Sequence, residues 1–250
     1  MRRSINSFFS PAEEEEVVRY QDRRDAGKFL ARRLAHFKDD PKAVVLALPR
    51  GGVPVAYEVA EQLHLPLDVF VVRKLGVPLF EELAMGAIAT GGVRILNEEV
   101  IRRLHITPQI IDAATKEQQD ELERREGRYR GGRTPLAVHG KPAILVDDGL
   151  ATGSSMRAAI QALRLLSPSE IIVAVPVGCS EICEQLEKEV QEVICGKTPE
   201  SFQAVGQWYT DFSQTRDEEV TELLNRAAHR RRVRELSKAK GDPIAELDVA

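Results

Sequence analysis

The stretch that decides the fold is residues 143–156, which read AILVDDGLATGSSM. It opens with four apolar residues, 143–146, which predict a buried β-strand. Two acids, Asp147 and Asp148, follow the strand, and a helical pattern begins at Ser154. A strand that passes through a short loop into a helix is the repeating unit of a parallel α/β sheet. Because ligands bind beyond the carboxyl ends of such strands, we expect a binding site in this loop.

The rest of the chain repeats this alternation. We predict further strands at 42–48, 67–72, 170–177, 190–195 and 201–205, and helices at 22–37, 53–63, 108–130, 154–166, 180–189 and 217–232. The pattern predicts an α/β fold with a mostly parallel sheet flanked by helices. The less regular regions 73–96 and 190–212, singly or together, are expected to form a small hood or subdomain, with a hairpin turn at 90–92.

The length of 250 residues suits one such domain. We assign 1–21 as an N-terminal lead-in, 22–232 as the domain, and 233–250 as a polar tail that is open to disorder. The segment before the acidic run 13–16 lacks the apolar core of a secretory signal, and the apolar run 171–177 is too short to span a bilayer. We therefore expect a cytoplasmic protein with no membrane partner.

Charge and cysteine content exclude other classes. The net charge of −4 gives no positive field that would attract nucleic acid. Five arginines lie in 226–234, but no aromatic residue interleaves them, so a solvated helix or an oligomer contact is the better interpretation and a homodimer stays open. Three cysteines without CxxC spacing favour reduced thiols over disulfides or a zinc site.

The loop after the acids has the composition of an anion site. Gly153 allows close approach to the backbone, and Thr152, Ser154 and Ser155 supply hydroxyl groups at a helix start with free N–H groups. The acids suit sugar hydroxyls or a cation, so a sugar phosphate would satisfy both halves. The alternative is an ordinary strand-to-helix loop with a hydroxyl cap. Neither GxGxxG nor GxxxxGK[ST] is present in this segment.

Residues 146–155 resemble the signature of the type I phosphoribosyltransferases for 5-phosphoribosyl 1-pyrophosphate (PRPP). The resemblance implies the corresponding fold, with Asp147 and Asp148 on the ribose hydroxyls and on Mg²⁺ through water and PRPP. It implies that 151–155 wrap the 5-phosphate. The PRPP-binding residues that we assign on this basis are Arg50, Gly51, Gly52, Asp147, Asp148, Gly149, Leu150, Ala151, Thr152, Gly153, Ser154 and Ser155.

Two further segments fit the same family. Residues 48–52 resemble its pyrophosphate loop, in which Arg50 would add charge to backbone amides, and Lys74 follows the second strand where members often place a basic residue. We assign Arg50 and Lys74 as catalytic, against the alternatives of a plain turn and a solvated basic pair. Residues 202–212 loosely resemble the hood of purine phosphoribosyltransferases. Trp208 could stack on a base there, although we favour a core aromatic.

The chain as a whole is most similar to a bacterial group described only as phosphoribosyltransferases. The resemblance implies transfer of ribose 5-phosphate from PRPP to a small nitrogenous acceptor, with Mg²⁺ and with release of pyrophosphate. The alternative is a non-catalytic PRPP or nucleotide sensor that uses the same fold. The acidic net charge weighs against RNA as the partner of such a sensor.

Overall fold

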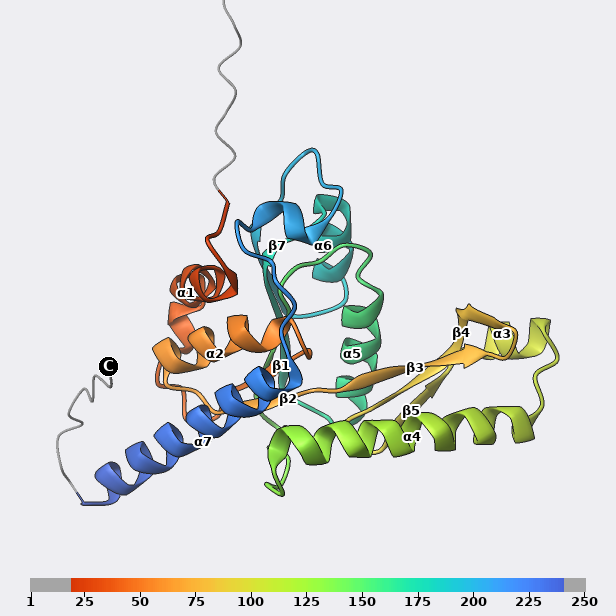
Figure 1. The fold of residues 1–250 in the computed structure, drawn as a ribbon, viewed down its shortest axis with the longest axis horizontal. Helices are drawn as coiled ribbons and strands as arrows, with labels where there is room; N and C mark the ends of the chain where they lie inside the picture. Colours follow the sequence, from red (N-terminus) through yellow and green to blue (C-terminus); the bar gives the residue numbers. More distant parts are fainter. Residues whose placement is uncertain (1–18, 241–250) are drawn as a thin grey trace, which may run out of the picture.

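The computed structural model describes residues 19–240, and its centre is a five-stranded sheet (Figure 1). Every strand pair in the sheet is parallel, and the order is β2-β1-β6-β7-β8. The strands are β1 (Val44–Ala47), β2 (Leu67–Val69), β6 (Pro142–Val146), β7 (Glu170–Val177) and β8 (Glu192–Lys197). The helices are α1 (Arg23–Arg33), α2 (Gly52–Leu63), α3 (Glu98–Arg103), α4 (Pro108–Arg130), α5 (Ser154–Leu165), α6 (Ser180–Glu187) and α7 (Asp217–Lys240), with short 3₁₀ turns at Ala35–Phe37 and Val205–Trp208.

Strand β1 is apolar and fully buried, and β6 and β7 are apolar and buried after their first residue, because both faces of the sheet are covered there, whereas the edge strands β2 and β8 contain charged residues. Successive side chains of a strand point to opposite faces. In β1, Val45 and Ala47 pack in the cluster that includes α1, α2 and α7, whereas Val44 and Leu46 pack in the cluster that includes α5 and α6. This three-layer arrangement leaves the loops at the carboxyl ends of the strands as the place where polar groups gather.

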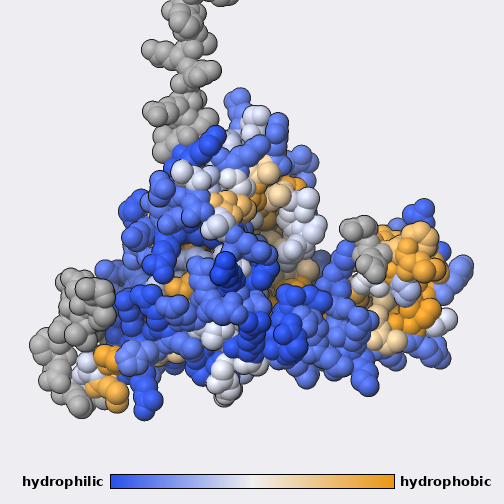
Figure 2. All heavy atoms as spheres, viewed as in Figure 1, coloured by the Kyte–Doolittle hydropathy of each residue, from blue (hydrophilic) through white to orange (hydrophobic). Residues whose placement is uncertain are grey.

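A second, antiparallel sheet forms a small subdomain that projects to one side together with α3 and α4 (Figure 1). Its strands are β3 (Val72–Val77), β4 (Phe80–Ala89) and β5 (Val93–Leu96), in the order β3-β4-β5. Apolar side chains are exposed at its tip, where Figure 2 shows an orange patch: Leu79 is 95% exposed and Phe80 is 64% exposed.

The predicted fold class is confirmed, as is the subdomain in the region 73–96. The strand predicted at 201–205 is wrong: the chain there bends into the 3₁₀ turn Val205–Trp208. Aromatic packing explains this, because Phe202 and Trp208 pack against a cluster that contains Tyr20 and Tyr209. Helix α7 runs to Lys240, beyond the end predicted at 232.

The expectations for 1–18 and 241–250 lie outside the described residues. In the described part of the chain, no helix is long and apolar enough to cross a membrane.

Candidate functional site

The two loops that the sequence singled out meet at one edge of the sheet. Strands β1 and β6 are neighbours, and the Leu48 amide donates to the Val146 carbonyl at 2.9 Å. A Cβ placed on Gly51 would lie 2.0 Å from Asp148 Oδ2, and one on Gly52 would lie 2.7 Å from the Val146 carbonyl oxygen. Only glycine, which has no Cβ, allows the turn after β1 to lie this close to the end of β6. This close contact explains the two glycines in the turn.

The acid pair lies at the end of β6 and is partly buried. Burial and the neighbouring Asp148 carboxylate raise the pKa of Asp147 well above its usual value. Burial also raises the pKa of Asp148, while the Arg23 guanidinium opposes this shift. Two desolvated carboxylates therefore share one neighbouring arginine, and the pair favours further positive charge or hydrogen-bond donors.

Arg23, in the first turn of α1, is the closest partner of the acids. Its Nε donates to Asp148 Oδ2 at 2.8 Å, and Nη1 donates to the Ser213 carbonyl at 2.7 Å. The guanidinium lies over the Phe212 ring, 3.9 Å from the centroid. The sequence reasoning missed Arg23 because no motif surrounds it and 125 positions separate it from Asp148.

Tyr209 is a second partner that the sequence reasoning missed. Its hydroxyl donates to the Asp148 backbone carbonyl at 2.5 Å, and burial raises its pKa, so the hydroxyl remains a donor. Trp208 packs beside the cluster of Tyr20 and Val177, and its carbonyl accepts from the Tyr20 amide at 2.9 Å. Its indole Nε1 is buried, with no hydrogen-bond partner among residues 19–240. In the segment that contains Trp208, Tyr209 is therefore the aromatic that contacts the acid pair, and Phe212 contacts the arginine beside it.

The loop after the acids presents free donors. Gly153 has φ +72° and precedes α5 without a side-chain cap. Within residues 19–240, no backbone carbonyl accepts from the amides of Ala151, Thr152, Gly153 or Ser155. The Ser154 amide makes one long contact, 3.5 Å, to Thr152 Oγ1. These amides and the α5 N-terminus can bind an anion.

Gly149 and Leu150 hold this loop in place. The Leu150 amide donates to the Val177 carbonyl at 2.9 Å, and its side chain is buried. A Cβ on Gly149 would lie 2.4 Å from Val205 Cγ1. The Leu150 amide is thus already bonded, and the free amides begin at Ala151.

The basic residues have separate positions. Arg50 Nη1 lies 3.8 Å from Asp217 Oδ1 at the start of α7, and its side chain is 38% exposed. Arg73 donates to Gln118 Oε1 of α4 at 2.6 Å. Lys74 is exposed in β3, opposite Ala87 of β4. The structure brings Arg50 beside the glycine turn, whereas Arg73 and Lys74 belong to the antiparallel subdomain.

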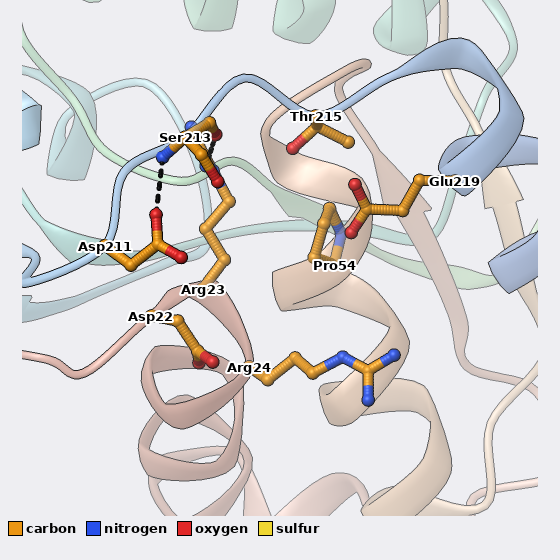
Figure 3. Close-up of a pocket in the computed structure, with 8 residues that line it drawn as sticks. All are labelled: Asp22, Arg23, Arg24, Pro54, Asp211, Ser213, Thr215 and Glu219. Carbon is orange, nitrogen blue, oxygen red and sulfur yellow. Dashed lines mark hydrogen bonds between the residues drawn. The ribbon is translucent and has the colours of Figure 1, made fainter.

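A cavity of about 130 Å³ adjoins Arg23, and Figure 3 shows its walls. The N-terminal turns of α1, α2 and α7 meet there, close to the 211–215 segment. Its lining residues are Asp22, Arg23, Arg24, Pro54, Asp211, Ser213, Thr215 and Glu219. Arg23 therefore separates a small polar cavity from the acid pair.

The acid pair fits a hydrated divalent cation better than a closed metal cage. No group of three or more metal-ligating side chains occurs among the residues that the structure describes. Two carboxylates with raised pKa values beside a single arginine nevertheless suit Mg²⁺, which keeps waters and takes few protein ligands.

Comparison with known proteins agrees with this geometry. A family model described as "Phosphoribosyl transferase domain" matches residues 19–211. The Mycobacterium tuberculosis (strain H37Rv) protein named "Putative phosphoribosyl transferase" is 49% identical over 208 residues, which cover 83% of this chain and 47% of that protein. The crystal structure of TT1426 from Thermus thermophilus superposes with a TM-score of 0.72 at 42% identity, covering 82% of this chain and 97% of that one.

The fold is thus an α/β protein with an acid pair, a glycine turn and a loop with free amides at the carboxyl edge of its parallel sheet. The chain belongs to the phosphoribosyl transferase family. It spans about half the length of the M. tuberculosis relative. It is also 34% identical over 131 residues to a Chloroflexus aurantiacus protein named "Bifunctional protein PyrR", covering 50% of this chain and 65% of that protein.

Proposed function

We propose that the protein transfers ribose 5-phosphate from PRPP to a nitrogenous acceptor and releases pyrophosphate. The observation that carries this proposal is the contact between the glycine turn and the acid pair, where a Cβ on Gly51 would overlap Asp148 Oδ2. The free amides of 151–155 follow the same acids in the chain. One ligand with a phosphate, a ribose and a pyrophosphate can therefore span all three groups.

Each part of the site has a chemical role in this reaction. The 151–155 amides and the α5 N-terminus hold the 5-phosphate, and the carboxylates of Asp147 and Asp148 accept hydrogen bonds from the ribose hydroxyls. The Gly51 amide and Arg50 face the pyrophosphate. As the bond from C1 to pyrophosphate breaks, the acceptor nitrogen forms the new bond to C1 and the acceptor's proton is released.

Catalysis in this scheme depends on position and electrostatics. Arg50 is half-buried and only weakly paired, at 3.8 Å from Asp217, so it can turn toward the leaving group. Mg²⁺, held through water by Asp147 and Asp148, would neutralise charge on the pyrophosphate. Lys74 stays a proposed catalytic residue, and it would act only if the subdomain brings it to the leaving group.

The acceptor would enter beside Arg23. The 130 Å³ cavity there is lined mainly by charged and hydroxyl side chains, which suits a small polar molecule with hydrogen-bond donors and acceptors. Trp208 packs in the aromatic cluster and is the weaker candidate for stacking, whereas Phe212, beneath Arg23, borders this region.

A sensor role is the second candidate, and the Arg23–Asp148 ion pair favours it. A ribose hydroxyl that binds Asp148 must share it with Arg23, which also contacts Ser213 and Phe212. Binding of PRPP could thus shift the 211–213 segment and signal to a partner without turnover.

One experiment separates the two functions. Pyrophosphate release is measured with PRPP, Mg²⁺ and a panel of nitrogenous bases, for wild type and for the Asp147→Asn, Asp148→Asn double variant. An enzyme releases pyrophosphate with at least one base, and the double variant does not. PRPP binding by calorimetry without any release supports the sensor, and no PRPP binding at all would overturn both candidates.

A further inference from the structure

A second, larger cavity lies away from the candidate site. Its volume is about 400 Å³, and it is formed by the end of α4, the segment after it, the start of β2 and residues 224–235 of α7. The lining residues are Leu67, Asp68, Arg130, Arg133, Thr134, Leu136, Leu224, Ala227, Ala228, Arg231, Arg232 and Glu235. Leu67 is the first residue of β2, so this cavity is at the amino end of the strand, opposite the PRPP-type loops.

Two of its four arginines are neutralised within the fold. Arg130 is 4% exposed and donates to Asp68 Oδ1 at 2.9 Å, while its Nη1 lies 3.0 Å from Glu126 Oε1. Arg231 pairs with Glu235 on the next turn of α7 at 2.7 Å. We assign Arg130 to the architecture of the cavity, since it joins α4 to β2.

The other two arginines keep unmatched charge. Arg133 donates to the Asn225 side-chain oxygen and to the Tyr129 carbonyl, both of which are neutral. Arg232 is exposed and, within residues 19–240, forms no ion pair. Two guanidinium groups from separate elements therefore line one cavity without a carboxylate partner, and guanidinium groups suit phosphate oxygens.

The remaining wall is apolar. Leu224 and Ala227 of α7 are buried, and Leu67 and Leu136 are partly buried. A mixed lining of this kind, in a cavity within the size range of small-molecule sites, suits a ligand with an anionic end and a flat apolar part. An inorganic anion provides the negative charge but not the flat apolar part.

We propose that this cavity is a second ligand site, distinct from the PRPP site, for a phosphorylated small molecule of the mononucleotide class. Its phosphates bind Arg133 and Arg232, and its base packs on Leu136, Leu224 and Ala227. The mixed polar and apolar lining and the acidic net charge of the chain favour a mononucleotide over an RNA backbone.

The test is calorimetric titration of the full chain with ADP, with adenosine and with inorganic pyrophosphate. We expect ADP to bind more tightly than either fragment. The Asp147→Asn, Asp148→Asn variant removes the ribose contacts of the other site and should retain this ADP binding. Arg133→Gln combined with Arg232→Gln should weaken it by at least about tenfold, as expected for lost charged hydrogen bonds.

Arg234→Gln, on the same helix but outside the cavity lining, is the matched control and should bind ADP like wild type. Arg232→Glu affects an exposed side chain and leaves the contacts of Arg133 in place, so it tests the charge even if the double variant fails to fold. The proposal is overturned if Arg232→Glu and the double Gln variant bind ADP like wild type, or if the Asp147, Asp148 variant loses all ADP binding.

Discussion

Arg23 and Asp148 form a largely buried ion pair, with Nε 2.8 Å from Oδ2 and side-chain exposures of 11% and 16%. The pair joins the first turn of α1 to the end of β6. Because Arg23 also contacts Ser213 and Phe212, the orientation of the acid pair depends on three segments that are distant in the sequence.

We predict that Arg23→Gln lowers the free energy of unfolding by about 3 kcal/mol, because it leaves a buried carboxylate without its charged partner. Urea denaturation measures this. In a double-mutant cycle with Asp148→Asn, we expect a coupling energy of about 2 kcal/mol. Arg24→Gln, at the exposed neighbouring position, is the control and should change stability by less than about 0.5 kcal/mol. A coupling energy near zero would show that the ion pair does not hold Asp148.

Asp147→Asn should raise stability and weaken ligand binding. A carboxyl with a raised pKa in the fold binds its proton more tightly when folded, so wild type loses stability as pH rises from about 3.8 through the raised value. At pH 7 we expect the variant to be more stable by on the order of 1 kcal/mol, and this gain should disappear at pH 3. Urea denaturation at both pH values measures it.

The same carboxylate is assigned to the ribose hydroxyls, so replacing both acids with Asn should reduce PRPP affinity by roughly 2–4 kcal/mol while the fold is kept. Calorimetry measures the affinity, and circular dichroism checks the fold. Unchanged PRPP binding by the folded double variant would remove Asp147 and Asp148 from the proposed site.

Gly51→Ala should abolish PRPP binding through shape alone. Gly51 has φ −58°, which any residue can adopt, but its Cβ would lie 2.0 Å from Asp148 Oδ2. The matched control is Gly127→Ala in α4, where no atom lies within 4 Å of the added Cβ and helix propensity predicts a gain of about 1 kcal/mol. Thermal unfolding and calorimetry on both variants check this. Normal PRPP binding by Gly51→Ala would mean that binding does not require the close contact between the glycine turn and the acid pair.

Arg50→Ala should lower turnover by on the order of 10²-fold, since charge on pyrophosphate grows toward the transition state. Ribose 5-phosphate binding should barely change because that ligand lacks pyrophosphate. Arg128→Ala is the control: Arg128 also pairs with Asp217, at 2.7 Å, but comes from α4 and is not one of the assigned PRPP-binding residues. If Arg50→Ala weakened the binding of PRPP and of ribose 5-phosphate equally, Arg50 would have only a structural role.

Removal of Mg²⁺ by EDTA should weaken PRPP binding far more than ribose 5-phosphate binding, because the proposed Mg²⁺ would neutralise charge on the pyrophosphate, which ribose 5-phosphate lacks. In the Asp147, Asp148 variant, this difference should shrink. Titrations with and without EDTA measure it, and PRPP affinity that is independent of Mg²⁺ would contradict the assigned cofactor.

The sequence by itself determined most of the local structure and the composition of the candidate loop after β6. The run 170–177 predicted a strand with the observed bounds, since a strand buried on both faces has no polar alternation. The strands predicted at 42–48, 67–72 and 190–195 are present with bounds of 44–47, 67–69 and 192–197. The acids, Gly153 and the hydroxyl residues predicted a site at a strand-to-helix loop because those groups are adjacent in the chain.

Only the tertiary structure decided which distant groups complete that site. Arg23 and Tyr209 reach Asp148, and Phe212 reaches Arg23, through packing of α1 and the 205–213 segment, and no local periodicity encodes such contacts. The strand predicted at 201–205 failed for the same reason, because aromatic packing outweighed local β propensity there. Local sequence patterns depend on residues that are a few positions apart, whereas tertiary packing determines which residues lie beside a buried charge.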